Sequence, residues 1–247
     1  MPFIPAGYPD LAATGALIQS LEQAGASAIE IGIPFSDPIA DGPVIQEAFS
    51  HALANRVRVR DVLATVAAAR KASDLPLIAM VSFSIVFRYG AARFFADARG
   101  AGFDAVILPD LPPPEAAPIC AEARSAALDT ILLVSPTTTP QRRSEILRLC
   151  SGFVYYLSVT GITGERDALP PELAANVTSL RHEAQVPVCV GFGISKPEHL
   201  SQLAQLADGA IVGSALVRRI REHAGEGPAQ IARVAAAYCR ELLAAVR

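Results

Sequence analysis

Ala28-Ile29-Glu30-Ile31-Gly32-Ile33 is the stretch that decides the fold, because it places one carboxyl group within a short apolar run. Side chains alternate between the two faces of a β-strand, so Ile29 and Ile31 share one face and Glu30 points to the other. If the isoleucines face covering helices, Glu30 projects into the interior of a closed sheet. The stretch therefore predicts a parallel strand of a barrel with an acidic group inside it.

Short apolar runs of the same kind recur along the chain, each bounded by Gly, Pro or Asp, as is typical of parallel strands covered by helices. We predict strands at 3–6, 28–31, 77–81, 105–108, 130–134, 153–157, 188–190 and 210–212. Amphipathic, alanine-rich stretches predict helices at 12–24, 60–71, 91–99, 114–126, 141–150, 171–183, 197–206 and 228–246. Three glycines that follow helices are predicted C-caps, namely Gly25, Gly100 and Gly102.

Eight strand–helix units within 247 residues predict an α/β fold, a single-domain (β/α)8 TIM barrel spanning residues 1–247, since such barrels need about 250 residues. An open doubly wound sheet is the alternative, and the lack of a Gly-x-Gly-x-x-Gly turn after the first strand argues against it. The first predicted strand begins almost at Met1, so we expect the N-terminal helix before strand 1 to be missing.

The composition argues against several classes of partner. The net charge is −3, and no Lys/Arg stripe with interleaved aromatic residues is present, so nucleic acid is not an expected partner. No apolar run reaches the roughly 18 residues that span a membrane, and no secretory signal opens the sequence. Four widely spaced cysteines without a Cys-x-x-Cys pair predict free thiols in a reducing compartment. We therefore expect a soluble, cytoplasmic protein.

Glu30 is the first candidate for chemistry, because barrel active sites lie at the carboxyl ends of the strands. Burial of an unpaired carboxyl group raises its pKa toward neutrality, where the group can both donate and accept a proton. The alternative is a structural glutamate paired with a buried Arg or Lys. No basic residue lies near the ends of the neighbouring strands in the sequence, which favours the catalytic interpretation.

The loop at 34–43 follows this strand and carries two more carboxylates. Asp37 precedes a proline, and we interpret it as a turn residue. Asp41 leads into a helix that begins near Gly42-Pro43. It is either a helix cap or a second site carboxylate that faces Glu30.

Two glycine-containing turns predict a phosphate site. Barrels often bind phosphate between the loops after strands seven and eight and a helix N-terminus. Gly191-Phe192-Gly193-Ile194-Ser195 and Gly213-Ser214 stand at these places, and the second opens a helix. The segment 158–166, after strand six, holds two glycines and several small polar residues. It is either a lid that excludes water or a plain surface loop.

The run from Ile29 to Gln46 resembles, almost residue for residue, the signature of the tryptophan synthase alpha subunits. Similar matches occur at 3–10, 110–112, 157–164, 191–195 and 213–214, so the resemblance covers nearly the whole chain. It implies that Glu30 is the catalytic acid/base, that Asp41 binds the indole N–H and that Tyr155 lies near the cleaved bond. It implies substrate-binding roles for Phe3 in the indole wall, Thr163 and Gly164 in the closing loop, and Phe192, Gly193, Gly213 and Ser214 around the phosphate.

The implied reaction is a retro-aldol cleavage of indole-3-glycerol phosphate into indole and glyceraldehyde 3-phosphate, as part of tryptophan biosynthesis. It needs no metal and no cofactor on this chain. The resemblance also implies a partner, a pyridoxal-phosphate beta subunit in an alpha2beta2 heterotetramer. Stiff loops at 34–38 and 112–114 would face that partner.

One segment departs from the family pattern. After strand three the family usually carries Tyr and Asn, whereas Met80-Val81-Ser82-Phe83-Ser84 has serine at both places. We expect Phe83 to supply the missing aromatic surface. The departure motivates one alternative, an allosteric partner of the beta subunit with weakened catalysis. The other alternative is a phosphate-binding barrel enzyme of the indole or histidine pathways, although no Lys or Cys stands at a strand end.

Overall fold

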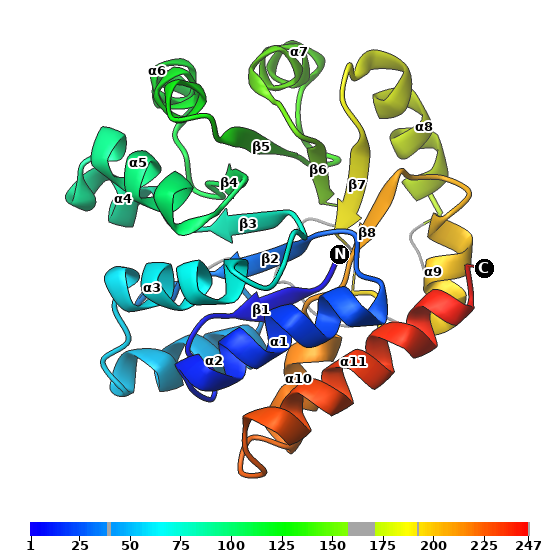
Figure 1. Cartoon of the computed structure of the whole chain (residues 1–247). Coiled ribbons are helices and arrows are strands. Elements are labelled where there is room, and N and C mark those ends of the chain that lie inside the picture. Colours follow the sequence, from blue (N-terminus) through cyan, green and yellow to red (C-terminus); the bar gives the residue numbers. More distant parts are fainter. Residues whose placement is uncertain (39–40, 158–170, 192, 247) are drawn as a thin grey trace.

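The computed structural model describes residues 1–38, 41–157, 171–191 and 193–246. Eight parallel strands form one sheet in sequence order, curled into a ring (Figure 1). The strands are β1 Phe3–Pro5, β2 Ile29–Gly32, β3 Leu77–Met80, β4 Ala105–Ile107, β5 Asp129–Val134, β6 Val154–Leu157, β7 Val188–Gly191 and β8 Gly209–Ile211. Val212 closes the ring, because it accepts a 2.9 Å hydrogen bond from the Phe3 N–H and donates one of 2.9 Å to Met1.

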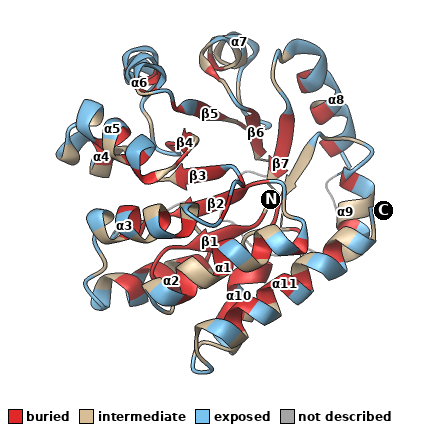
Figure 2. Ribbon diagram, in the orientation of Figure 1, coloured by how far each residue is buried: buried red, intermediate tan, exposed pale blue. Residues whose placement is uncertain are grey.

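Helices cover the outside of the ring. They are α1 Leu11–Ala24, α2 Pro43–Ala54, α3 Val59–Arg70, α4 Phe83–Tyr89, α5 Ala91–Ala101, α6 Pro113–Ser125, α7 Pro140–Leu149, α8 Leu173–Glu183, α9 Pro197–Leu203, α10 Ser214–Glu222 and α11 Pro228–Ala244. Figure 2 shows buried residues along the strands and on the helix faces that meet them, while the outer faces are exposed. From opposite ends of the chain, α1 and α11 lie side by side (Figure 1). The predicted (β/α)8 barrel is confirmed.

The predicted elements agree with the structure to within a few residues at most ends. Gly25 and Gly102 cap α1 and α5 in the left-handed conformation, with φ of 98° and 100°. The prediction for Gly100 was wrong, because this residue lies inside α5, two residues before the true cap. Within the described residues no helix precedes β1.

The pairing register decides which side chains enter the barrel. Phe3, Glu30 and Ile78 are opposite one another on β1, β2 and β3, and residues paired in this way project from the same face of a sheet. Ile78 belongs to a small apolar cluster inside the ring, which is separate from the layer between strands and helices. The other buried members of this interior cluster are Ala28, Ala105, Ile107, Ile131, Phe153, Tyr155, Cys189 and Ile211.

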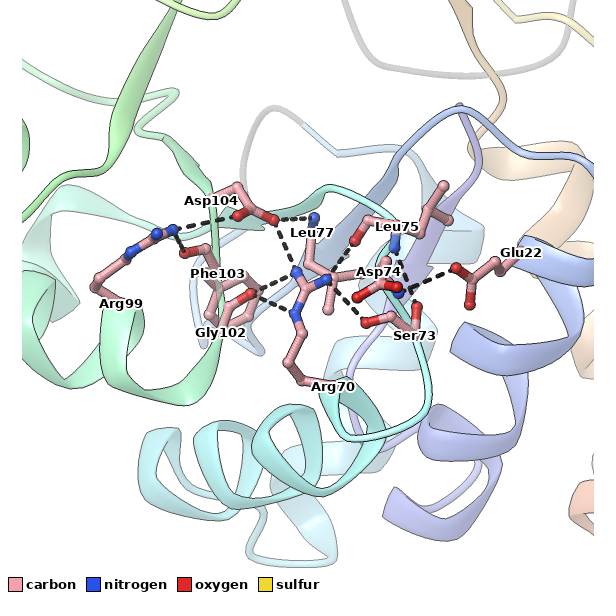
Figure 3. Close-up of polar contacts among 10 residues, drawn as sticks. All are labelled: Glu22, Arg70, Ser73, Asp74, Leu75, Leu77, Arg99, Gly102, Phe103 and Asp104. Carbon is pink, nitrogen blue, oxygen red and sulfur yellow. Dashed lines mark hydrogen bonds and ion pairs between the residues drawn. The ribbon is translucent and has the colours of Figure 1, made fainter.

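A polar clamp, whose contacts Figure 3 shows, joins the starts of β3 and β4. It therefore lies at the end of the barrel opposite the carboxyl ends of the strands. The Asp104 carboxylate accepts a 3.0 Å hydrogen bond from the Leu77 N–H and a 2.7 Å bond from Arg70. Arg70 also donates to the carbonyls of Gly102 and Leu75. The clamp therefore connects the end of α3 to the starts of two neighbouring strands.

The Asp104→Ala substitution is expected to lower the free energy of unfolding by about 1–3 kcal/mol. It leaves the N–H of the fully buried Leu77 without its side-chain acceptor, and an unpaired buried donor costs about that much. Urea unfolding of both proteins measures the difference. Glu145→Ala is the control, since it removes only a 3.1 Å pair with Arg142 within one helix, a type worth about 0–1 kcal/mol. Equal losses in the two variants would contradict the assignment.

Candidate active site

Glu30 lies at the centre of β2 and is completely buried. Its register with Ile78, a member of the interior cluster, places its side chain inside the barrel. Neither carboxyl oxygen has a hydrogen-bond partner among the described groups. In the described part of the chain, Glu30 also forms no ion pair with Lys or Arg, so the structural ion-pair interpretation lacks support.

The environment of Glu30 favours its neutral form. Burial raises its pKa from 4.5 to about 8, and the Met1 ammonium group opposes part of this rise. A carboxyl group in such a site is protonated at neutral pH, so it can donate a proton to a ligand and accept one afterwards.

Asp41 lies in the loop after β2, just before α2. The Asp41 N–H donates to the Pro38 carbonyl at 3.1 Å, and the Gln46 side chain donates to the Asp41 carbonyl at 2.8 Å. The cap of α2 is Gly42, and no side chain caps this helix, so the capping interpretation of Asp41 is wrong. Burial raises the pKa of Asp41 from 3.8 to about 6. At neutral pH it is mainly ionised and can accept a hydrogen bond.

Asp37, in the same loop, differs from Asp41. It is exposed, and its carboxylate accepts a 2.6 Å hydrogen bond from Ser36. This contact within the loop agrees with the predicted turn role.

Tyr155 brings the three predicted catalytic residues together. It is buried in the interior cluster on β6. Burial raises its pKa well above 10, and the charges of Glu30 and Asp41 raise it further, so both acids lie near the phenol. Gly191 on β7 lies against the ring, where a Cβ atom would overlap Tyr155. Only glycine at position 191 leaves room for the Tyr155 ring.

A cavity of about 150 Å³ opens at the carboxyl ends of β2, β3 and β4. Its lining is Ile33, Phe35, Asp37, Pro38, Asp41, Phe49, Met80, Val81, Ser82, Pro109 and Asp110. Phe3 contributes indirectly, because its ring meets Phe49 edge-on at 6.5 Å between centroids. The lining combines apolar side chains with three carboxylates, Asp37, Asp41 and Asp110, and this mixture suits a flat aromatic ring that carries an N–H donor.

Asp110 is a residue of this wall whose role sequence reasoning missed. Its carboxylate accepts hydrogen bonds from the Ser82 hydroxyl at 2.6 Å and from the Phe83 N–H at 2.7 Å. The Ser82 and Ser84 hydroxyls lie 2.8 Å apart. The sequence did contain a signal for this residue, because Asp110 stands just beyond the end of the predicted strand at 105–108, where site residues of a barrel are expected. The expectation for Phe83 was wrong, because it begins α4 and contacts Phe87 instead of lining the cavity.

The predicted phosphate residues lie at the ends of β7 and β8. Gly213 is the cap of α10 and Ser214 its first residue. The first backbone N–H groups of a helix have no partner within it. Ser214 is buried, and its hydroxyl also lacks a described partner. Gly193 lies in the loop between β7 and α9. Thr163, Gly164 and Phe192 lie outside the described residues.

Comparison with known proteins identifies the family. A family model described as tryptophan synthase alpha chain matches residues 1–247. The chain belongs to the tryptophan synthase alpha chain family. A Geobacter alpha chain is 46% identical over 223 residues, which cover 90% of this chain and 84% of the relative. The alpha chain of Chloroflexus aggregans is 45% identical over 246 residues, which cover 99% of this chain and 91% of the relative.

Solved structures agree with this family assignment. Mycobacterium tuberculosis tryptophan synthase aligns with a TM-score of 0.89 and 39% identity, over 100% of this chain and 91% of that one. The Legionella pneumophila alpha subunit aligns with a TM-score of 0.90 and 38% identity, over 99% of this chain and 91% of that one.

The activity of the tryptophan synthase alpha chain family is the cleavage of indole-3-glycerol phosphate, so the chain is a carbon–carbon lyase of tryptophan biosynthesis. This assignment removes the alternative of another phosphate-binding barrel enzyme. Among the residues that the structure describes, no cluster of His, Cys, Asp and Glu could hold a metal ion, and no helix could cross a membrane.

Proposed function

We propose that this chain cleaves indole-3-glycerol phosphate with Glu30 and Asp41 as its catalytic acids and Tyr155 beside the reacting bond. One observation carries the proposal: the fully buried Glu30 and the half-buried Asp41 both lie near Tyr155, and burial raises the pKa of Glu30 to about 8 and that of Asp41 to about 6. At neutral pH the first is protonated and the second ionised, and such separated values assign acid and base roles.

The reaction can proceed by proton transfer alone. The protonated Glu30 gives its proton to C3 of the indole ring, while Asp41 accepts a hydrogen bond from N1–H and stabilises the positive charge that develops there. The carboxylate of Glu30 then takes the proton of the adjacent side-chain hydroxyl. The carbon–carbon bond breaks, its electrons restore the indole ring, and the hydroxyl carbon becomes an aldehyde. Because the protonated indole ring takes up the electrons of the broken carbon–carbon bond and the protein only moves protons, we propose that the chain uses neither a metal nor a cofactor of its own.

We propose that the substrate phosphate binds in a phosphate cradle formed by residues 193–195 and the start of α10 at Gly213-Ser214. Unpaired N–H groups and the positive end of the helix dipole attract anions. The buried, unpartnered hydroxyl of Ser214 supports this assignment. Phosphate held away from the reacting bond would orient the indole ring between the two acids. Phe192, and Thr163 and Gly164 as a closing loop, remain proposed substrate contacts.

The Ser214→Asp substitution tests the cradle. It adds a negative charge beside the phosphate, so the KM for indole-3-glycerol phosphate is expected to rise about tenfold to hundredfold with little change in kcat. Thr139→Asp is the matched control, since it adds the same charge at the cap of α7, and its KM should equal that of the parent. If Ser214→Asp leaves the KM unchanged, phosphate does not bind here.

Release of indole from indole-3-glycerol phosphate by the purified protein tests the function as a whole. A chain that releases no indole, alone or with a beta subunit, contradicts the proposed mechanism.

We also propose that the chain assembles with a beta subunit as an alpha2beta2 complex, in which only the beta subunit carries pyridoxal phosphate. The loop at 34–38 and the segment 112–114 are proposed to face that partner; the expectation of a second loop was wrong, because Pro112 caps α6 and Pro113 and Pro114 are its first residues. Pro112, Pro113 and Pro114 are exposed at the start of α6, and proline-stiffened segments lose little conformational freedom on docking. The cytoplasm is the proposed location, supported by four unpaired cysteines.

A further inference from the structure

We propose that Tyr238 is a positioning residue that holds the two halves of the phosphate cradle together. The inference rests on the proposed phosphate site and adds to it a residue from α11, a helix that contributes no other residue to that site. Tyr238 is 3% exposed. It contacts one element from each half of the cradle.

The first contact is a hydrogen bond to the loop after β7. The Tyr238 hydroxyl donates to the Ser195 carbonyl at 3.0 Å, across 43 residues of sequence. The bond turns this carbonyl toward α11. Since a trans peptide group directs its C=O and N–H to opposite sides, the N–H of Lys196 points away from α11. A carbonyl oxygen repels an anion, so a bond that holds it outward favours phosphate binding.

The second contact is with the helix after β8. The guanidinium group of Arg219 lies over the Tyr238 ring, 4.0 Å from its centroid. Arg219 belongs to α10, the helix that begins at Ser214. A cation over an aromatic face is attracted to it. One side chain therefore links the loop at Ser195 to the helix at Ser214.

The surroundings of Tyr238 explain why the hydroxyl matters. Tyr238 borders a cavity of about 290 Å³ between β8, α9 and α11, whose walls include Leu203, Leu216 and Leu242. A buried tyrosine hydroxyl among apolar side chains needs a partner, and Ser195 provides one. Phenylalanine would fill the same volume, so the hydroxyl serves the loop rather than the core. Because the cavity leaves α9 incompletely packed on this side, the bond restrains the loop that precedes it.

The Tyr238→Phe variant tests this role, because it keeps the ring under Arg219 and removes only the hydroxyl. We expect the KM for indole-3-glycerol phosphate and the Kd for inorganic phosphate, measured by calorimetry, to rise together by about threefold to tenfold. We expect kcat to stay within about twofold, since the bond acts on binding rather than on the reacting atoms.

Tyr89→Phe is the matched control. It removes a 2.7 Å hydrogen bond from a tyrosine hydroxyl to Asp97, between α4 and α5. A merely structural role for Tyr238 predicts similar losses of Tm in both variants and no change of KM in either. The positioning role predicts a higher KM in Tyr238→Phe alone. Arg219→Gln provides a second variant, with an expected rise of about twofold to fivefold in the same two constants.

The outcomes separate the two proposals. If the parent binds inorganic phosphate and Tyr238→Phe binds it equally well, the positioning role is overturned and the cradle stands. If the parent binds no phosphate and Ser214→Asp has the same KM for indole-3-glycerol phosphate as the parent, the proposed phosphate cradle is wrong. The proposed role of Tyr238 is then wrong as well.

Discussion

Replacement of Glu30 by glutamine is expected to lower kcat for indole release by about 10²-fold to 10⁴-fold, the usual contribution of a general acid/base. Glutamine has nearly the same shape, but its amide can neither give a proton to C3 nor take one from the substrate hydroxyl. Steady-state assays of indole formation measure the loss. The KM should change little, because the phosphate cradle is untouched.

The same variant separates the catalytic role of Glu30 from the proposed role of the chain as a partner of a beta subunit. If the parent activates a beta subunit, Glu30→Gln should activate it equally, since its loops and fold are unchanged. Indole release equal to that of the parent would remove Glu30 from the mechanism.

Glu30 also predicts how stability depends on pH. In the folded protein its pKa is about 8, against 4.5 as the ordinary value. Below about pH 4.5 both states hold the proton, whereas between these values only the folded state does, so stability falls as pH rises through this window. The total loss is roughly 4 to 5 kcal/mol. Urea unfolding at pH 5 and pH 8 should show this fall in the parent, and Glu30→Gln should lack it. Equal pH dependence in both proteins would contradict the raised pKa.

The barrel could be predicted from the sequence because its signals are local. The alternation around Glu30 and the glycine and proline boundaries depend on neighbouring residues only. The helix α4 was missed although Ser82 caps it locally by accepting a hydrogen bond from the Ser84 N–H. Its start has a second, long-range contact, because Asp110 accepts hydrogen bonds from Ser82 and Phe83 after a separation of nearly thirty residues. A contact of this kind leaves no periodic pattern in the chain.

The site shows the same division between local and long-range signals. Glu30 and Ser214 were predicted because each follows from its place on a strand or at a helix start. Asp41 remained ambiguous between cap and site residue, and only the position of the cap at Gly42 excluded the first interpretation. The bond from Tyr238 to Ser195 joins elements 43 residues apart, so neither residue type nor spacing could have predicted it.

Replacement of Asp41 by asparagine is expected to lower kcat/KM for indole-3-glycerol phosphate by about 10²-fold to 10³-fold, the usual effect of losing one group that stabilises charge in the transition state. Asparagine still accepts a hydrogen bond from N1–H, but it carries no charge to balance the positive ring. Most of the loss should therefore appear in kcat.

The pH profile makes this prediction specific. In the parent, activity should fall below about pH 6, where Asp41 gains a proton, and above about pH 8, where Glu30 loses one. A bell-shaped profile of kcat/KM reports such a pair of groups. Asp41→Asn should lose the acidic limb and keep the basic one. Glu47→Gln is the control, because it removes the same charge from an exposed pair with Arg221, and both limbs should persist. If the acidic limb survives in Asp41→Asn, another group controls it, and the residual catalysis does not depend on a carboxylate at this position.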